Sequence, residues 1–92
     1  MADERLQRLA EIRNSKGLHA RAAAKFCKLV QQFESEITVG RNGTEVSGGS
    51  IMGLMMLAAA PGTTIEITAV GGDAARAIDA LCELVAAKFG EE

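Results

Sequence analysis

Hydrophobic and polar residues alternate along four stretches of the chain, which is the pattern of strands that bury one face. The clearest stretch is residues 64–69, where Ile65, Ile67 and Ala69 share one side and polar residues share the other. The other three stretches are residues 6–13, 36–39 and 44–47. The last two are separated by Asn42-Gly43, a dipeptide that favours a two-residue hairpin turn between antiparallel strands.

Apolar residues recur at three- and four-residue steps in two other stretches, as they do on one face of an amphipathic helix. In residues 20–33 this stripe consists of Ala23, Phe26, Cys27, Val30 and Phe33. A last helix follows the turn Gly71-Gly72-Asp73, which is expected to cap it. Its predicted inward face consists of Ala74, Ala77, Ile78, Leu81, Cys82, Val85 and Phe89.

A third, shorter helix is predicted over residues 51–57, a run of apolar residues. Ser50 precedes it and can cap its first turn, and Pro61-Gly62 stops it. The predicted order of elements is therefore β-α-β-β-α-β-α. Laying three helices on one face of a four-stranded antiparallel sheet buries every apolar surface and leaves the other face in solvent. The sequence thus predicts an α+β fold, an open-faced β-sandwich, in a single domain over residues 1–92.

Charge, hydropathy and cysteine count exclude several classes of function. The 92 residues carry 10 basic and 12 acidic side chains, a net charge of −2, which argues against a nucleic-acid partner. The longest apolar run, residues 51–60, is too short to span a membrane, and the amino end lacks the features of a secretory signal, so a cytoplasmic protein is expected. Cys27, Cys82 and the one histidine are too few and too widely spaced for a metal site, and both cysteines are expected to be buried.

The one histidine is placed where chemistry is expected. His19 lies in Gly17-Leu18-His19-Ala20-Arg21, where a glycine turn leads into the predicted helix. The first amides of a helix lack partners and carry partial positive charge, so they can hold a phosphoryl group attached to a neighbouring imidazole. Arg21 adds a guanidinium in the first turn. From spacing alone, a capping or half-exposed histidine without a chemical role is the more common case.

Two segments resemble one known family. Residues 17–26, Gly-Leu-His-Ala-Arg-Ala-Ala-Ala-Lys-Phe, resemble the phosphorylation-site segment of HPr, the histidine-containing phosphocarriers of the bacterial phosphoenolpyruvate-dependent phosphotransferase system. Residues 50–57, Ser-Ile-Met-Gly-Leu-Met-Met-Leu, resemble the regulatory-serine region of that family, at the matching distance from the histidine. The resemblance extends over residues 5–89 and favours a phosphoryl-carrying His19 over a merely capping one.

The resemblance implies a relay in which phosphorylated enzyme I passes its phosphoryl group to the δ1 nitrogen of His19 and an enzyme IIA domain removes it. The chain would then be a carrier without turnover of its own, and no cofactor is expected. The family's arginine role falls on Arg21, and Ala20, Arg21 and Lys16 are the expected phosphate-binding residues. Ser50 takes the regulatory-serine role, with an HPr kinase/phosphorylase as a further partner. A monomer is expected, which docks on its partners through Ile51, Met52 and Met55.

Two positions depart from the family's pattern, and they leave alternatives open. Ala22 stands where the family commonly has proline in the first helical turn. Alanine lacks the fixed φ angle by which proline favours the start of a helix. Lys16 stands where some members have asparagine and offers a mobile charge instead of an oriented amide. Such alanine variants also occur among HPr-like proteins of phosphotransferase branches that regulate nitrogen or carbon metabolism. The alternative to a phosphoryl carrier is therefore a regulatory binding module that acts mainly through Ser50. A small hydrolase that uses His19 as its base is disfavoured, because this segment offers no Ser or Cys nucleophile together with a third, orienting group.

Overall fold

Four strands form one antiparallel sheet in the computed structural model, which describes residues 4–91. The strands are β1 (Glu4–Glu11), β2 (Glu36–Arg41), β3 (Thr44–Ser47) and β4 (Thr64–Gly71), and their order across the sheet is β1-β4-β2-β3. The helices are α1 (Ala20–Val30), α2 (Ile51–Met56) and α3 (Ala74–Ala86), followed by the short 3-10 helix η1 (Lys88–Gly90). The predicted order β-α-β-β-α-β-α is confirmed.

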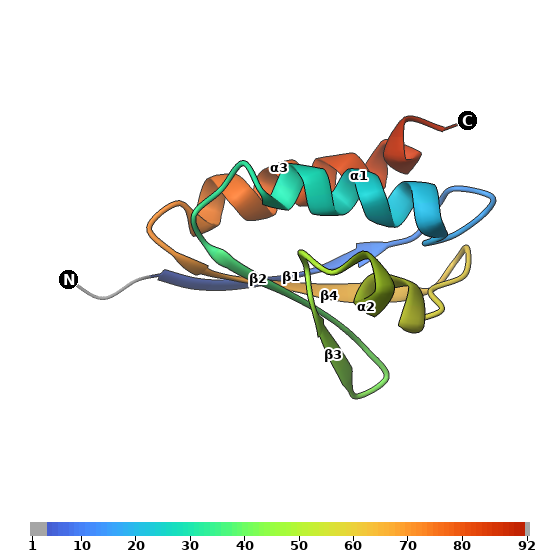
Figure 1. The fold of residues 1–92 in the computed structure, drawn as a ribbon, viewed down its shortest axis with the longest axis horizontal. Helices are drawn as coiled ribbons and strands as arrows, with labels where there is room; N and C mark the ends of the chain where they lie inside the picture. The colour runs from blue at the N-terminus through green and yellow to red at the C-terminus, as the bar shows by residue number, and fades with distance from the viewer. Residues whose placement is uncertain (1–3, 92) are drawn as a thin grey trace.

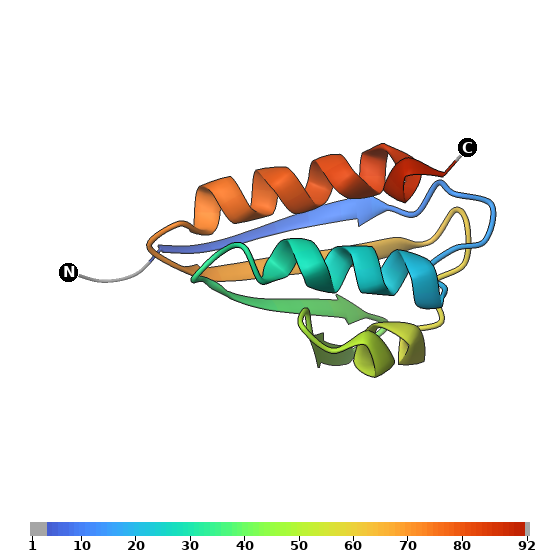
Figure 2. The ribbon, with the colours of Figure 1, turned by 45° about the horizontal axis from the view of Figure 1, so that its top comes forward.

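The three helices cover one face of the sheet (Figures 1 and 2), as predicted. In Figure 2, α3 runs alongside β1, α1 lies over the central strands, and α2 lies in front of β3. Contacts join α3 to β1 and α2 to β3. Ile65, Ile67 and Ala69 of β4 point towards the helices and are buried. Val39 and Ile37 of β2 are the register partners of Ile67 and Ala69, so the apolar sides of the two central strands are adjacent. Because apolar and polar residues alternate along these strands, these apolar side chains face the helices together and form the centre of the core.

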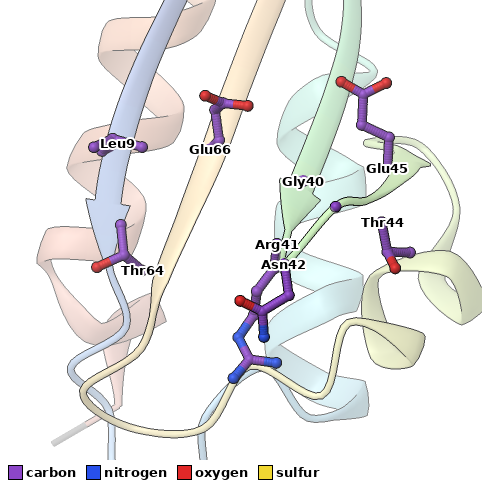
Figure 3. A pocket seen from close by; sticks show the side chains of 9 residues that line it. Leu9, Gly40, Arg41, Asn42, Thr44, Glu45, Thr64 and Glu66 are labelled. Carbon is purple, nitrogen blue, oxygen red and sulfur yellow. The ribbon is translucent and has the colours of Figure 1, made fainter.

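Within residues 4–91, the opposite face of the sheet carries no helix and displays one glutamate each from β4 and β3. Leu9, Glu66, Gly40 and Glu45 are successive register partners across the four strands. Because Gly40 has no side chain, this row encloses a shallow hollow of about 470 Å³ with Glu66 and Glu45 on either side (Figure 3). His19 lies on the helix side of the molecule, so this hollow is separate from the predicted site.

Some predicted boundaries and burial assignments are wrong. The first strand begins and ends two residues earlier than predicted. It begins at Glu4 because β4 extends to Gly71, the register partner of Glu4, and it ends at Glu11 because the chain opposite Ile12 turns at Gly62 with φ +88°. Helix α1 ends at Val30, and the Phe33 N–H bonds to the Val30 carbonyl three residues back, which closes a tight turn. Phe33 and Cys82 are half-buried, whereas Phe89 is buried but lies in η1 beyond the end of α3. Within residues 4–91, no helix is long and apolar enough to cross a bilayer.

Asp73 precedes α3 as predicted, but its side chain does not cap that helix. Its carboxylate instead accepts hydrogen bonds from the Glu34 amide and from the Ser35 amide, both at 2.9 Å, and from the Ser35 hydroxyl. The pKa of Asp73 lies below its ordinary value, mainly because the Ser35 hydroxyl donates to the charged carboxylate and also because the Glu34 amide does. These hydrogen bonds outweigh the desolvation, which raises the pKa. Asp73 therefore ties the turn before β2 to the turn before α3. We call Asp73, Glu34 and Ser35 the carboxylate clasp.

Candidate functional site

His19 is the N-cap residue of α1. Its backbone is extended, with φ −84° and ψ −179°, and its carbonyl accepts the Ala23 amide at 2.8 Å, the first bond of the helix. Gly17, at φ +65°, makes the preceding turn. A Cβ at Gly17 would lie 2.6 Å from the Ala59 carbonyl oxygen, so a residue with a side chain does not fit there. This local geometry places the imidazole at the amino end of α1, as predicted.

The hydrogen bonds of the imidazole define its tautomer. Nδ1 accepts the Arg21 backbone N–H at 3.3 Å, so Nδ1 carries a lone pair and not a proton. In the neutral ring the proton is then on Nε2, which lies 2.7 Å from a carboxylate oxygen of Glu91. The His19 side chain is 24% exposed. The site thus presents an imidazole whose Nδ1 lone pair faces the amides at the start of a helix and accepts one of them in a long hydrogen bond.

Glu91 contacts the imidazole directly, and sequence reasoning missed it. Its Oε2 faces His19 Nε2, and its Oε1 accepts a hydrogen bond from the Asn14 side-chain amide at 3.1 Å. Desolvation is the largest effect on the Glu91 carboxyl and raises its pKa, but hydrogen bonds from Asn14 and His19 outweigh it, and the pKa lies below its ordinary value. Glu91 lies 72 positions from His19, and no motif or periodicity near it indicates the contact.

Basic side chains line the surface on both sides of the imidazole. Lys16, Arg21 and Lys25 line one depression of about 350 Å³ together with Glu91. Lys16 and His19 line a second groove of about 260 Å³ together with the Ala58-Ala59-Ala60-Pro61 segment. Lys16, Ala20 and Arg21 are all exposed. The three predicted phosphate-binding residues are therefore in the same neighbourhood as the imidazole and open to solvent.

Helix α2 displays an apolar patch next to α1. Ser50 is its N-cap, with a half-buried side chain whose Oγ accepts the Gly53 amide at 2.9 Å. The exposed fractions are 42% for Ile51, 74% for Met52, 44% for Met55 and 74% for Met56. Sequence reasoning singled out the first three residues and omitted Met56. These four side chains, which we call the α2 patch, face solvent beside α1, and Figure 2 shows the two helices side by side.

The two cysteines do not contribute to this site. Burial raises the pKa of the Cys27 thiol, and burial also raises that of Cys82 despite the nearby Arg8. Within residues 4–91, no three histidine, cysteine or acidic side chains are grouped as metal ligands. The chemistry available is therefore that of one nucleophilic nitrogen, helix amides and basic side chains, which together can bind a phosphoryl group covalently and compensate its charge.

Known proteins match almost the whole chain. A family model described as the PTS HPr component phosphorylation site matches residues 6–87. "Phosphocarrier protein HPr" of Neisseria meningitidis serogroup A is 52% identical over 86 residues, covering 94% of this chain and 97% of that protein. "Phosphocarrier protein NPr" of Shewanella violacea is 45% identical, covering 95% and 96%. The crystal structure of HPr-C-His from Thermoanaerobacter tengcongensis superposes with a TM-score of 0.90 at 41% identity, covering 95% and 98%.

Proposed function

Because the chain belongs to the HPr family of phosphotransferase-system phosphocarriers, we propose that it accepts a phosphoryl group from phosphorylated enzyme I on His19 Nδ1 and passes it to an enzyme IIA domain. One observation carries the proposal. The Nδ1 lone pair lies at the amino end of α1, where it accepts one long hydrogen bond from the Arg21 amide. A nucleophile in that position attacks phosphorus with anion-binding amides already beside it.

The transfer itself forms one bond and breaks one. The Nδ1 lone pair attacks phosphorus, the bond from phosphorus to the donor breaks, and its electron pair leaves with the donor. The Arg21 amide is then free to donate to a phosphoryl oxygen, and the Arg21 and Lys16 side chains supply positive charge from the adjoining surface. The reverse step on enzyme IIA regenerates the free imidazole. The protein is therefore a carrier without turnover of its own, and not an enzyme.

The α2 patch is the proposed docking surface for both partners. Flexible methionines adapt to surfaces of different shape, and a carrier must meet a donor and an acceptor in turn. Ile51, Met52 and Met55, with the added Met56, are exposed on the helix next to α1. A transient complex of this kind buries about 1,200 Å² or less in total. We further propose a single-domain monomer that works in the cytoplasm.

Ser50 is the proposed regulatory phosphorylation site, modified by an HPr kinase/phosphorylase. Its Oγ caps the Gly53 amide and adjoins the α2 patch. A phosphate would add a charge of about −2 beside this apolar surface. The charge would repel an acidic partner and would interrupt the apolar contact between the two proteins. The proposed consequence is weaker docking of enzyme I.

A second candidate function follows from the 45% identity to "Phosphocarrier protein NPr". In this alternative the chain is a regulatory binding module of a branch that controls nitrogen or carbon metabolism, and it acts mainly through Ser50 or the phosphorylation state of Ser50. Mass spectrometry after separate incubation with enzyme I and with an HPr kinase distinguishes the two. A pure regulatory module is modified at Ser50 alone, whereas a carrier is modified at His19.

The experiment that tests the carrier function is labelling from phosphoenolpyruvate and enzyme I. We expect the unmodified chain to acquire acid-labile phosphate and His19→Ala to acquire none. His19→Asn is the matched control, because asparagine retains an acceptor at the helix cap but is not a phosphoryl acceptor. Both variants should keep the helical circular dichroism spectrum of the parent chain. Acid-labile label on a folded His19 variant would refute the assignment.

A further inference from the structure

We propose that Glu91 is a positioning residue for His19, which fixes the imidazole tautomer for attack by Nδ1 and compensates the positive charge that the ring gains on phosphorylation. The inference rests on the proposed function of His19 as the phosphoryl acceptor. It starts from the 2.7 Å contact between Glu91 Oε2 and His19 Nε2. Both side chains are largely buried there, with exposed fractions of 16% and 24%.

The backbone before Glu91 is held in an unusual conformation. Lys88, Phe89 and Gly90 have φ values of 59°, 56° and 75°, so three consecutive residues lie in the left-handed region. Two of them carry side chains, for which this region costs about 1–2 kcal/mol per residue. Such strain persists where the surrounding structure over-determines it, and it is most often found at functional sites.

Two contacts hold this strained turn in place. The Phe89 side chain is fully buried in the core between the helices and the sheet. The Lys25 ammonium, on α1, donates a hydrogen bond to the Phe89 carbonyl oxygen at 2.7 Å. The first contact fixes the turn to the core, and the second fixes it to the same helix that His19 caps. Glu91 is thereby delivered to the amino end of α1.

Asn14 fixes the orientation of the carboxylate. This asparagine is fully buried, and its amide nitrogen donates to Glu91 Oε1 at 3.1 Å and to the Gly17 carbonyl at 2.7 Å. Each oxygen of Glu91 thus has its own donor, Asn14 for Oε1 and His19 for Oε2. A carboxylate held in this way keeps the opposing imidazole nitrogen protonated and its ring oriented.

The chemical consequence concerns both states of the ring. With the proton on Nε2, Nδ1 keeps the lone pair that forms the bond to phosphorus, whereas the other tautomer carries a proton on Nδ1 and does not attack. When the bond to the donor breaks, its electron pair leaves with the donor, and the ring retains the Nε2 proton. The phosphorylated ring is then a cation, and the Glu91 carboxylate lies against the protonated nitrogen.

Three variants test this role. Glu91→Ala removes the acceptor and the charge, and Glu91→Gln removes the charge but keeps an acceptor for the Nε2 proton. Glu45→Gln is the matched control, because it removes one carboxylate from the open face of the sheet. Two quantities are measured for each: the ¹⁵N chemical shifts of the two His19 nitrogens at a pH where the ring is uncharged, and the rate constant for phosphoryl transfer from enzyme I. A thermal unfolding curve is recorded for each variant to establish that it is folded.

We expect Glu91→Ala to bring the two ¹⁵N shifts closer together, as in a mixture of tautomers, and to slow transfer about tenfold. Glu91→Gln should keep the parent's shifts and still transfer more slowly, while Glu45→Gln should match the parent in both. Unchanged shifts or an unchanged rate in Glu91→Ala would overturn the proposal. The shifts are read without any donor, so a parent chain that takes up no phosphate would refute the carrier function and leave the tautomer result standing.

Discussion

The two ends of the helical layer use polar side chains in opposite ways. At one end, the Asp73 carboxylate accepts three hydrogen bonds from Glu34 and Ser35 and joins two turns of the chain. At the other end, His19 Nδ1 makes one bond of 3.3 Å to the Arg21 amide. Both residues stand at the N-cap position of a helix. The clasp end has its acceptors occupied by the protein, whereas the histidine end keeps a nucleophile whose partner is easily displaced.

Backbone strain follows the same division. Ala58, Lys88 and Phe89 have left-handed φ values although they carry side chains. Ala58 lines the groove beside His19, and the other two lead to Glu91 at the same site. A protein that only needed stability at this end would place glycine at these positions. Three of the four non-glycine residues with positive φ within residues 4–91 thus belong to the surroundings of His19, which agrees with a functional role for this end of the molecule.

The largest expected effect at the histidine end comes from Arg21→Glu. Arg21 is exposed, so the change should leave the thermal unfolding temperature nearly unaltered. It replaces a guanidinium beside the incoming phosphoryl group by a negative charge, and we expect transfer from enzyme I to slow about 100-fold or more. Rapid-quench measurement of labelled phosphate on the chain gives the rate.

Lys28→Glu is the control for that change. Lys28 is also exposed and lies on α1, near the opposite end of the helix from His19. The same reversal of charge there should have a much smaller effect on transfer. Equal slowing by both variants would show that net charge, and not the position of Arg21, governs the rate.

The largest expected effect at the clasp end comes from Gly71→Ala. Gly71 has φ +153°, and a Cβ at this position would lie 2.5 Å from the Ser35 hydroxyl oxygen and 2.7 Å from the Ser35 Cα. The backbone of Ser35 must move, so we expect a loss of about 1–3 kcal/mol in the free energy of unfolding, measured with urea. Transfer per folded molecule should match the parent chain. Slowed transfer by a fully folded variant would contradict the separation of the two ends.

The elements that the sequence predicts well are those whose signal is local. Alternation in residues 64–69 predicts β4 because its three apolar residues become the centre of the core. The Asn42-Gly43 turn predicts the hairpin of β2 and β3, and the glycine turn before His19 predicts the position of the imidazole at the start of α1. In each case the pattern and the structure it predicts lie within a few residues of each other.

The features that sequence reasoning missed depend on residues that meet only in the folded chain. Glu91 reaches His19 across 72 positions, and Asp73 bonds to Ser35 across 38. A residue of the type favoured at N-caps was expected to cap α3, but the turn before β2 offers Asp73 two backbone donors and a hydroxyl. No local pattern predicts that competition, because a tertiary contact decides it.

A smaller effect, in the stabilising direction, is expected from Ala58→Gly. Ala58 has φ +50°, a conformation that costs a residue with a Cβ about 1–2 kcal/mol, while glycine loses part of this gain through its greater freedom in the unfolded chain. We expect a net increase of about 0.5–1 kcal/mol in the free energy of unfolding by urea. Asn42→Gly gives the matched comparison outside the site, at φ +52°. Loss of stability in Ala58→Gly would show that its methyl group packs favourably beside His19.

The last prediction concerns the stability that the clasp contributes as the pH falls. Asp73 has a pKa below its ordinary value of 3.8 in the folded state, because the Ser35 hydroxyl and the Glu34 amide stabilise its charged form. The stability it contributes is therefore fully present above about pH 4 and is lost as the pH falls through the lower, folded value. Urea unfolding at a series of acidic pH values should show a decline that is shallower in Asp73→Asn, which has no proton to gain at this position. Because the asparagine keeps one acceptor but lacks the charge, it should also be less stable than the parent at neutral pH and approach it in acid. Parallel curves for the two chains over this range would mean that the Asp73 carboxylate is no more stable in the fold than in the unfolded chain, and the clasp would then be a contact without a stabilising role.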